Sequence, residues 1–193
     1  YGLYQADEGE IYVGGKKTDI KNPNVAIANG IGMVHQHFML VEDFTVTQNI
    51  ILGNETTSHA GVVDMKRARK QILEIVEKYG LEVDPDAKVN DISVGMQQRV
   101  EILKALYRGA ELLILDEPTS SLTEKETARL FDLVKELSGR GISILYISHR
   151  MAEIFENDVS LLRASVCNVM SEALDSVKDC QFLCNKFDEY VWI

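Results

Sequence analysis

Short apolar runs and longer stretches with a helical repeat alternate along the chain, and this alternation predicts an α/β fold. The short runs, each followed by polar or charged residues, occupy positions 31–34, 111–115 and 142–147. Runs of this length are typical of strands in a parallel sheet, and we expect the strand at 111–115 to be buried on both faces. Helical stretches separate these strands, so we expect a parallel sheet covered by helices.

Capping residues mark the ends of the predicted helices. Asp64, Ser93 and Thr123 are the expected N-caps, and Thr123 forms a capping box with Glu126. Gly80 follows the last turn of the first helix, where glycine is favoured. The predicted inward-facing positions of the three helices are Ala68, Ile72, Ile75, Val76 and Tyr79; Met96, Val100, Leu103 and Leu106; and Leu130, Phe131, Val134 and Leu137.

Weaker patterns lie near the two ends. Residues 10–13 alternate and precede Gly14 and Gly15, which predicts a hairpin or an edge strand. Residues 19–30 predict a loop and a short helix. An amphipathic helix is predicted in the tail from the spacing of Val166, Val169, Met170, Leu174 and Val177.

The strand at 111–115 ends in two adjacent carboxylates, Asp116 and Glu117, followed by Pro118. Ligands of open α/β sheets bind beyond the carboxyl ends of the strands. Adjacent carboxylates at that place suit a hydrated Mg²⁺ and a polarised water. An isolated Asp-Glu pair can equally well do no more than end a strand, so the neighbouring segments decide between the two interpretations.

Composition limits the possible partners. The 193 residues suit one domain with a small inserted lobe, and a formal charge of −10 argues against a nucleic-acid binder, because phosphate binding needs clustered Lys and Arg. No run approaches the ~18 apolar residues that a membrane span requires, so any link to a membrane is expected to pass through a partner protein. Cys167, Cys180 and Cys184 are an odd set with no fourth zinc ligand in sequence, so free thiols in a reducing compartment are favoured over a zinc site.

Three further segments accompany the carboxylates: residues 32–36 (GMVHQ), 93–99 (SVGMQQR) and 146–150 (YISHR). In order and spacing these motifs resemble the ATP-binding subunit of ABC transporters, and residues 93–108 are most similar to the branch that imports simple sugars and nucleosides. The resemblance covers residues 1–157. It implies a P-loop NTPase-like parallel sheet with an inserted helical subdomain at about residues 41–108, and it leaves residues 158–193 as a divergent tail of unknown role.

The resemblance implies a role for each residue at the strand ends. Asp116 would hold Mg²⁺ through water, and Glu117 would act as general base on the hydrolytic water. His149 would contact the γ-phosphate, and the Gln36 amide would reach the Mg²⁺ and the attacking water. These roles suit phosphoryl transfer, which depends on positioning and charge neutralisation.

A second set of residues is implied to contact ATP held by an opposite subunit. Ser93 and Gly95 would contact its γ-phosphate, and Gln97 belongs to the same predicted nucleotide-binding set. Without the resemblance, Ser93 would be interpreted as a plain N-cap. The commoner form of the motif has glycine at Val94 and glutamine at Met96, whereas the sugar and nucleoside branch resembles this sequence at both positions.

Two departures from the family change the expected activity. Thr123 stands where an aspartate is usual, which argues against cross-subunit coupling at this position and favours a site whose two halves are unequal. No Gly-x-x-x-x-Gly-Lys-Ser/Thr occurs, and residues 1–4 resemble the segment that follows this phosphate-binding loop. We therefore expect an incomplete copy that alone binds ATP weakly or not at all, with the front and the tail altered either naturally or by an error in the gene model.

The implied cofactors are ATP and Mg²⁺. The implied partners are transmembrane permease subunits, a second ATPase domain in a head-to-tail dimer and, indirectly, a solute-binding protein, with no nucleic acid. The expected location is peripheral, at the cytoplasmic face of the plasma membrane. The alternative is a non-catalytic remnant that acts as a protein-interaction module. A translation or repair factor is disfavoured by the acidic charge and the short spacing between Gln36 and Ser93.

Overall fold

A computed structural model describes residues 1–5, 8–57, 61–148, 165–167, 181–182 and 191–192. Its centre is a four-stranded sheet in the order β3-β4-β5-β6, formed by Ile31–Val34, Leu112–Asp116, Ser143–Ile147 and Ser165–Cys167. Every neighbouring pair in this sheet is parallel. The predicted α/β fold with a parallel sheet is therefore confirmed.

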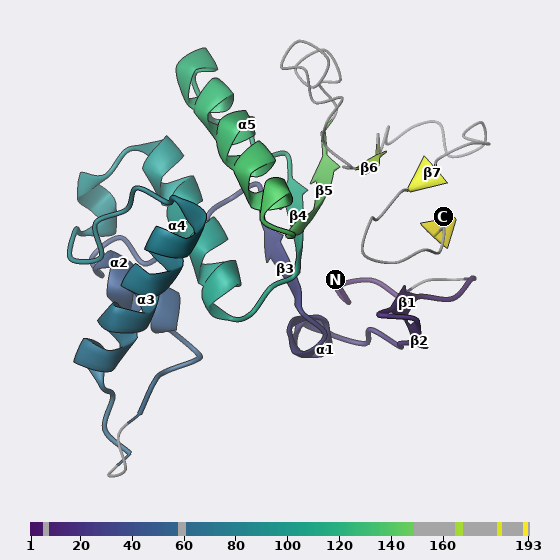
Figure 1. Ribbon diagram of the computed structural model, residues 1–193, viewed down its shortest axis with the longest axis horizontal. Coiled ribbons are helices and arrows are strands. Elements are labelled where there is room, and N and C mark those ends of the chain that lie inside the picture. The colour runs from purple at the N-terminus through teal and green to yellow at the C-terminus, as the bar shows by residue number, and fades with distance from the viewer. Residues whose placement is uncertain (6–7, 58–60, 149–164, 168–180, 183–190, 193) are drawn as a thin grey trace.

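The remaining elements surround this sheet. The helices are α1 (Pro23–Ala28), α2 (Val46–Ile51), α3 (Met65–Tyr79), the short 3-10 helix η1 (Val89–Asp91), α4 (Val94–Tyr107) and α5 (Glu124–Gly139). Two small antiparallel pairs join β1 (Tyr12–Val13) to β2 (Lys16–Lys17) and β7 (Gln181–Phe182) to β8 (Val191–Trp192). Figure 1 shows α2, α3 and α4 together on one side of the sheet, with α1 and the β1–β2 hairpin below it.

The helices begin at the residues that the sequence predicts. Asp64 accepts a hydrogen bond from the Arg67 amide at 3.0 Å, and Gly80 ends α3 with a left-handed φ of 67°. Thr123 and Glu126 make both hydrogen bonds of a capping box. A further capping box, which the sequence analysis missed, starts the short helix α2 with Thr45 and Gln48.

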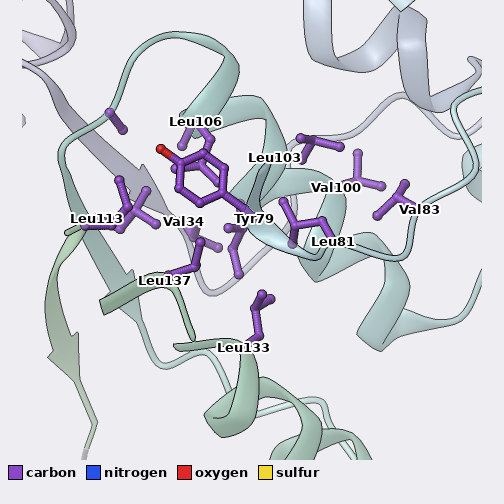
Figure 2. Close-up of a cluster of buried hydrophobic side chains, with 14 of the residues drawn as sticks. Val34, Tyr79, Leu81, Val83, Val100, Leu103, Leu106, Leu113, Leu133 and Leu137 are labelled. Atoms are coloured by element: carbon purple, nitrogen blue, oxygen red, sulfur yellow. The ribbon is translucent and has the colours of Figure 1, made fainter. Parts of the chain in front are cut away.

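The main hydrophobic core lies between the sheet and helices α2 to α5. Figure 2 shows side chains from these helices, the strands and the loop after α3 packed together, among them Val34, Leu103, Leu113 and Leu137. The expectation that the strand at 111–115 is buried on both faces is wrong. Leu113 and Leu115 are fully buried, whereas the alternate residues Leu112 and Ile114 are half-buried and pack against a smaller cluster beside α1.

Helix α4 approaches β3 very closely, and Gly32 makes this approach possible. A Cβ atom at Gly32 would lie 2.8 Å from the Cβ of Ala105 and 3.0 Å from the Cβ of Ala110. Small residues on both sides therefore set the distance between the helix and the sheet. This packing fixes the position of α4 relative to the strand ends.

The tail differs from its prediction in one place. Val166, assigned to an amphipathic helix, lies instead in β6, which pairs with β5 through Tyr146 and Val166. A partner strand supplies the backbone hydrogen bonds that the sequence pattern assigned to a helix. The other predicted positions of that helix lie outside the described residues. Among the described residues, no helix is both long enough and apolar enough to cross a bilayer.

Candidate functional site

The register of the sheet brings the ends of three strands to one edge. Val34 of β3 lies opposite Leu115 of β4, and Asp116 lies opposite Ile147 of β5. The chain leaves β3 through His35 and the exposed Gln36 at this same edge. Asp116, Glu117 and Gln36 are therefore brought together as predicted, and His149 lies outside the described residues.

Glu117 has an unusual backbone conformation. Its φ is 47°, and it is the non-glycine residue with positive φ among those that the structure describes. A left-handed backbone is costly for a glutamate and persists where the surrounding structure enforces it. The Glu117 amide donates a hydrogen bond to the Ile147 carbonyl at 2.9 Å, which anchors the residue to the end of β5. The half-buried Glu117 is thus held by the fold in a conformation typical of functional sites.

The segment after Glu117 consists of consecutive tight turns. The Ser120 amide donates to the Glu117 carbonyl at 3.2 Å, and the Leu122 amide donates to the Thr119 carbonyl at 3.1 Å. Thr119 is only 1% exposed. These turns lead directly to Thr123, the N-cap of α5, so the carboxylate edge and the start of α5 form one continuous structure.

The first turn of α4 contains the predicted residues Ser93 and Gly95. The Ser93 hydroxyl accepts a hydrogen bond from the Met96 amide at 3.3 Å, which confirms its capping role. The Gly95 amide donates to Glu126 Oε1 at 3.3 Å. Hydrogen bonds from the Thr123 backbone and hydroxyl, and then from Gly95 and Ser93, lower the pKa of Glu126. A carboxylate thus already lies at this helix N-terminus, where anions are stabilised.

The two groups of predicted residues are separate within the chain. A cavity of about 380 Å³ between α4 and α5 is lined by Ser93, Gly95 and Glu126, and its lining does not include Asp116, Glu117 or Gln36. The structure therefore brings Asp116, Glu117 and Gln36 to one edge and Ser93 and Gly95 to one cavity, but does not join the two groups into one site.

Neighbouring glutamines of α4 point to different places. The Gln97 amide donates to the carbonyls of Val89 at 3.2 Å and Ile92 at 3.4 Å, so this side chain lies on the backbone that leads into α4. Its contact with nucleotide stays a prediction. Gln98, which the sequence analysis missed, is 1% exposed and donates to the Pro118 carbonyl at 2.6 Å. The helix that begins at Ser93 therefore touches the turn that holds Glu117.

Glu101 connects α4 to the loop that follows Gln36. The Met39 amide donates to Glu101 Oε1 at 2.7 Å, and Lys104 Nζ donates to the Met39 carbonyl at 3.1 Å. Glu101 is 7% exposed and lies 3.7 Å from Lys104, whose pKa is lowered mainly by burial. The sequence signal available for Gln98 and Glu101 was that both are polar residues among the apolar positions of α4. A polar group that becomes buried there needs a hydrogen-bond partner.

The donor set at the strand ends fits Mg²⁺. Asp116 and Glu117 supply carboxylate oxygens, and Gln36 supplies an amide oxygen. Mg²⁺ prefers oxygen ligands and keeps several waters, so that one or two carboxylates together with phosphate oxygens are sufficient. Across the residues that the structure describes, no three His, Cys, Asp or Glu side chains form a group that could hold a metal ion by themselves.

Comparisons with known proteins identify relatives of the whole described core. The family model for ABC transporters matches residues 1–120. The chain is 57% identical over 153 residues to the nucleoside import ATP-binding protein NupA of Lactococcus lactis subsp. cremoris, covering 79% of the chain and 30% of that protein. It is 42% identical over 180 residues to the ribose import ATP-binding protein RbsA of Caldanaerobacter subterraneus subsp. tengcongensis, covering 92% of the chain and 36% of that protein.

Solved structures give the same result for the fold. An ATP-binding cassette of an ABC transporter in its ADP conformation matches with a TM-score of 0.68 and 25% identity, over 86% of this chain and 67% of that one. A dimeric bacterial ABC transporter cassette matches with a TM-score of 0.58 and 25% identity, over 78% and 67% of the two chains. The chain spans about a third of the length of the curated relatives that it matches.

Proposed function

Because the chain belongs to the ATP-binding cassettes of ABC transporters, we propose that it is part of an ATPase that drives import of nucleosides or simple sugars. It would supply the carboxyl edge of the sheet, with Asp116 and Glu117, and helix α4, which begins after Ser93 and is called the signature helix below. The observation that carries this proposal is the conformation of Glu117, which is held with a φ of 47° at the carboxyl edge of the sheet. Strained residues at such positions are typical of catalytic sites.

At this edge Glu117 would take a proton from the attacking water, and His149 and the Gln36 amide would orient the reacting groups. Asp116 would hold Mg²⁺, which when bound neutralises charge on the phosphate oxygens. Positioning and electrostatic stabilisation account for most of the catalysis of phosphoryl transfer. The alignment of β3, β4 and β5 supports this assignment, because it places Gln36, Asp116 and Glu117 at one edge.

Ser93 and Gly95 would contact ATP held by a second ATPase domain, with Gln97 nearby. Their separation from Asp116 and Glu117 supports a head-to-tail dimer, in which each domain contributes one of the two groups to each nucleotide. A relative of this fold has been solved as a dimer. Because Thr123 occupies the usual aspartate position, the two halves of such a site would be unequal.

Permease subunits would bind the helical lobe, predicted at about residues 41–108. This range contains α2, α3, η1 and α4. Several of its large apolar side chains are exposed, among them Phe44 at 37%, Leu52 at 41% and Val62 at 65%. Exposed apolar side chains within this range would suit a docking surface. The protein would then be peripheral at the cytoplasmic face of the plasma membrane, and a solute-binding protein would act on it only indirectly.

The test measures Mg-ATP binding and turnover by the purified protein, alone and in complex with its permease subunits. In the complex with the permease subunits, Glu117→Gln should keep nucleotide binding and lower turnover by at least about 100-fold, since general-base catalysis contributes about 10² to 10⁴. Glu124→Gln, an acidic residue exposed in the first turn of α5, is the matched control and should keep turnover. Permease binding without turnover that depends on Glu117 would instead favour the interaction module.

A further inference from the structure

Gln98 is the most deeply buried glutamine among the described residues and the proposed reaction gives it no role. It is 1% exposed and lies in the helix that begins with Ser93 and Gly95. A buried amide without a hydrogen bond is costly, so the contact that it makes is energetically significant. That contact is the 2.6 Å hydrogen bond from Gln98 Nε2 to the Pro118 carbonyl.

This hydrogen bond acts on the backbone next to Glu117. On its N-terminal side Glu117 is fixed by the hydrogen bond from its own amide to the Ile147 carbonyl. On its C-terminal side the following peptide carbonyl, that of Pro118, is fixed by Gln98. The left-handed conformation of Glu117 is thus held from β5 on one side and from α4 on the other.

The same helix also holds the loop after Gln36. Glu101 lies in the next turn of α4 and accepts the hydrogen bond from the Met39 amide at 2.7 Å. Helix α4 therefore joins the first-turn residues Ser93 and Gly95 to both loops at the carboxyl edge. A displacement of the N-terminus of α4 would therefore be transmitted to the backbone next to Glu117 through the Gln98 side chain.

We propose that Gln98 is a positioning residue for Glu117, which it holds in its left-handed conformation through the Pro118 carbonyl and so couples to the signature helix. The proposal rests on the proposed function, because it assumes that Glu117 is the general base. Gln98 touches no reacting group and acts only through the backbone.

The test compares Gln98→Leu, which removes the donor, with Gln71→Leu as the matched control. Gln71 is a half-buried glutamine of α3 with no role in the proposed site, and its Oε1 accepts hydrogen bonds from the hydroxyls of Thr56 at 3.1 Å and Tyr107 at 3.3 Å. In the assembled transporter Gln98→Leu should lower kcat for Mg-ATP by about 100-fold, since a displacement of a catalytic group by about 1 Å costs that much. The KM for ATP should stay within about twofold, and Gln71→Leu should change kcat by less than about threefold.

A loss of function through general instability would give a different result. Gln98→Leu combined with Glu117→Gln should be no slower in single-turnover assays than Glu117→Gln alone, because both act on the same step. If Gln98→Leu does not fold, Gln98→Met keeps the size and unbranched shape of the side chain and removes the donor. Equal kcat values for the Gln98 and Gln71 variants, or a loss confined to KM, would overturn the proposal.

Amide exchange separates this proposal from the proposed function. The Ser120 amide closes the turn onto the Glu117 carbonyl, so its exchange rate reports on that turn. It should exchange at least about tenfold faster in Gln98→Leu than in Gln71→Leu. If the wild-type protein shows no turnover that depends on Glu117, the proposed function fails and Gln98 has no catalytic group to position. Faster exchange in Gln98→Leu would then show that Gln98 stabilises the turn without a catalytic role. Unchanged exchange would show that Gln98 does not stabilise the turn either.

Discussion

Helices α3 and α4 lie on the same side of the sheet (Figure 1) and have similar lengths, yet they are buried in different ways. The fully buried positions of α3 form one stripe, Ala68, Ile72 and Tyr79, and its other faces carry exposed residues such as Leu73. Helix α4 is buried on several faces and includes the buried polar residues Gln98 and Glu101. The buried polar residues of α4 make hydrogen bonds to the loops at the carboxyl edge. In this protein the helix that is buried on several faces is therefore the one that positions the loops of the candidate site.

The largest expected difference between the two helices is in their ion pairs. Glu101→Ala should lower the free energy of unfolding by about 3 kcal/mol, since it leaves Lys104 and the Met39 amide without this partner inside the protein. Glu74→Ala removes the exposed pair with Lys70 on α3 and should cost less than about 0.5 kcal/mol. Urea denaturation of both variants measures the difference. Similar values would show that α4 is no more tightly bound to its surroundings than α3.

The close approach of α4 to β3 gives a second, smaller effect. Gly32→Ala places a Cβ 2.8 Å from the Cβ of Ala105, so the helix must move, at a cost of about 2 kcal/mol. Gly139→Ala meets no atom within 4 Å and is the control, with a change of less than about 0.5 kcal/mol. The two melting temperatures give the comparison. If Gly32→Ala lowers kcat more than stability predicts, the displacement of α4 also reaches the site.

The N-caps of the two helices should contribute similarly to the stability of the protein but differ in their effect on function. Asp64→Ala and Ser93→Ala each remove a side chain that caps a helix, and each should lower the unfolding free energy by about 1 kcal/mol. Under the proposed function, only Ser93→Ala should also lower ATP turnover in the assembled transporter. A parallel loss of turnover in both variants would show that turnover follows stability alone.

The sequence predicted the elements better than it predicted the contacts between them. Asp64, Ser93 and Thr123 are capping residues because caps depend on local hydrogen bonds that a sequence pattern records. The positions of Asp116, Glu117 and Gln36 at one edge followed from parallel strands. These are consequences of local chemistry and of the topology of a parallel sheet.

Other features depend on packing between segments that are distant in sequence. The periodicity of α4 indicated one apolar face, whereas Ile102 and Ala105 are also buried, together with Gln98. The half-buried face of β4 follows from the small cluster beside α1, which covers it incompletely. The contact from Glu126 to the Gly95 amide joins two helices whose relative position no local pattern encodes.

The smallest expected effect is a pH dependence at the start of α4. Hydrogen bonds from Thr123 and Gly95 lower the pKa of Glu126 from its ordinary value of 4.5, so the folded state favours the carboxylate. A lowered pKa stabilises the protein above the unfolded value and loses this contribution as the pH falls through the folded value. The stability difference between wild type and Glu126→Gln should therefore be constant between about pH 7 and pH 5, and should shrink below about pH 4.5.

Chemical denaturation at a series of pH values measures this difference, and Glu124→Gln controls for the general effect of a negative charge in the first turn of α5. The α3 start should behave differently, because Asp64 caps its own helix and α4 is held at its first turn by a carboxylate from α5. If the Glu126 difference did not change at low pH, neither the capping box with Thr123 nor the contact with Gly95 would stabilise the protein through the Glu126 carboxylate. The first turn of α4 would then be held only by its own Ser93 cap, as α3 is held by Asp64, and the contrast between the two helices would be confined to the buried contacts of Gln98 and Glu101.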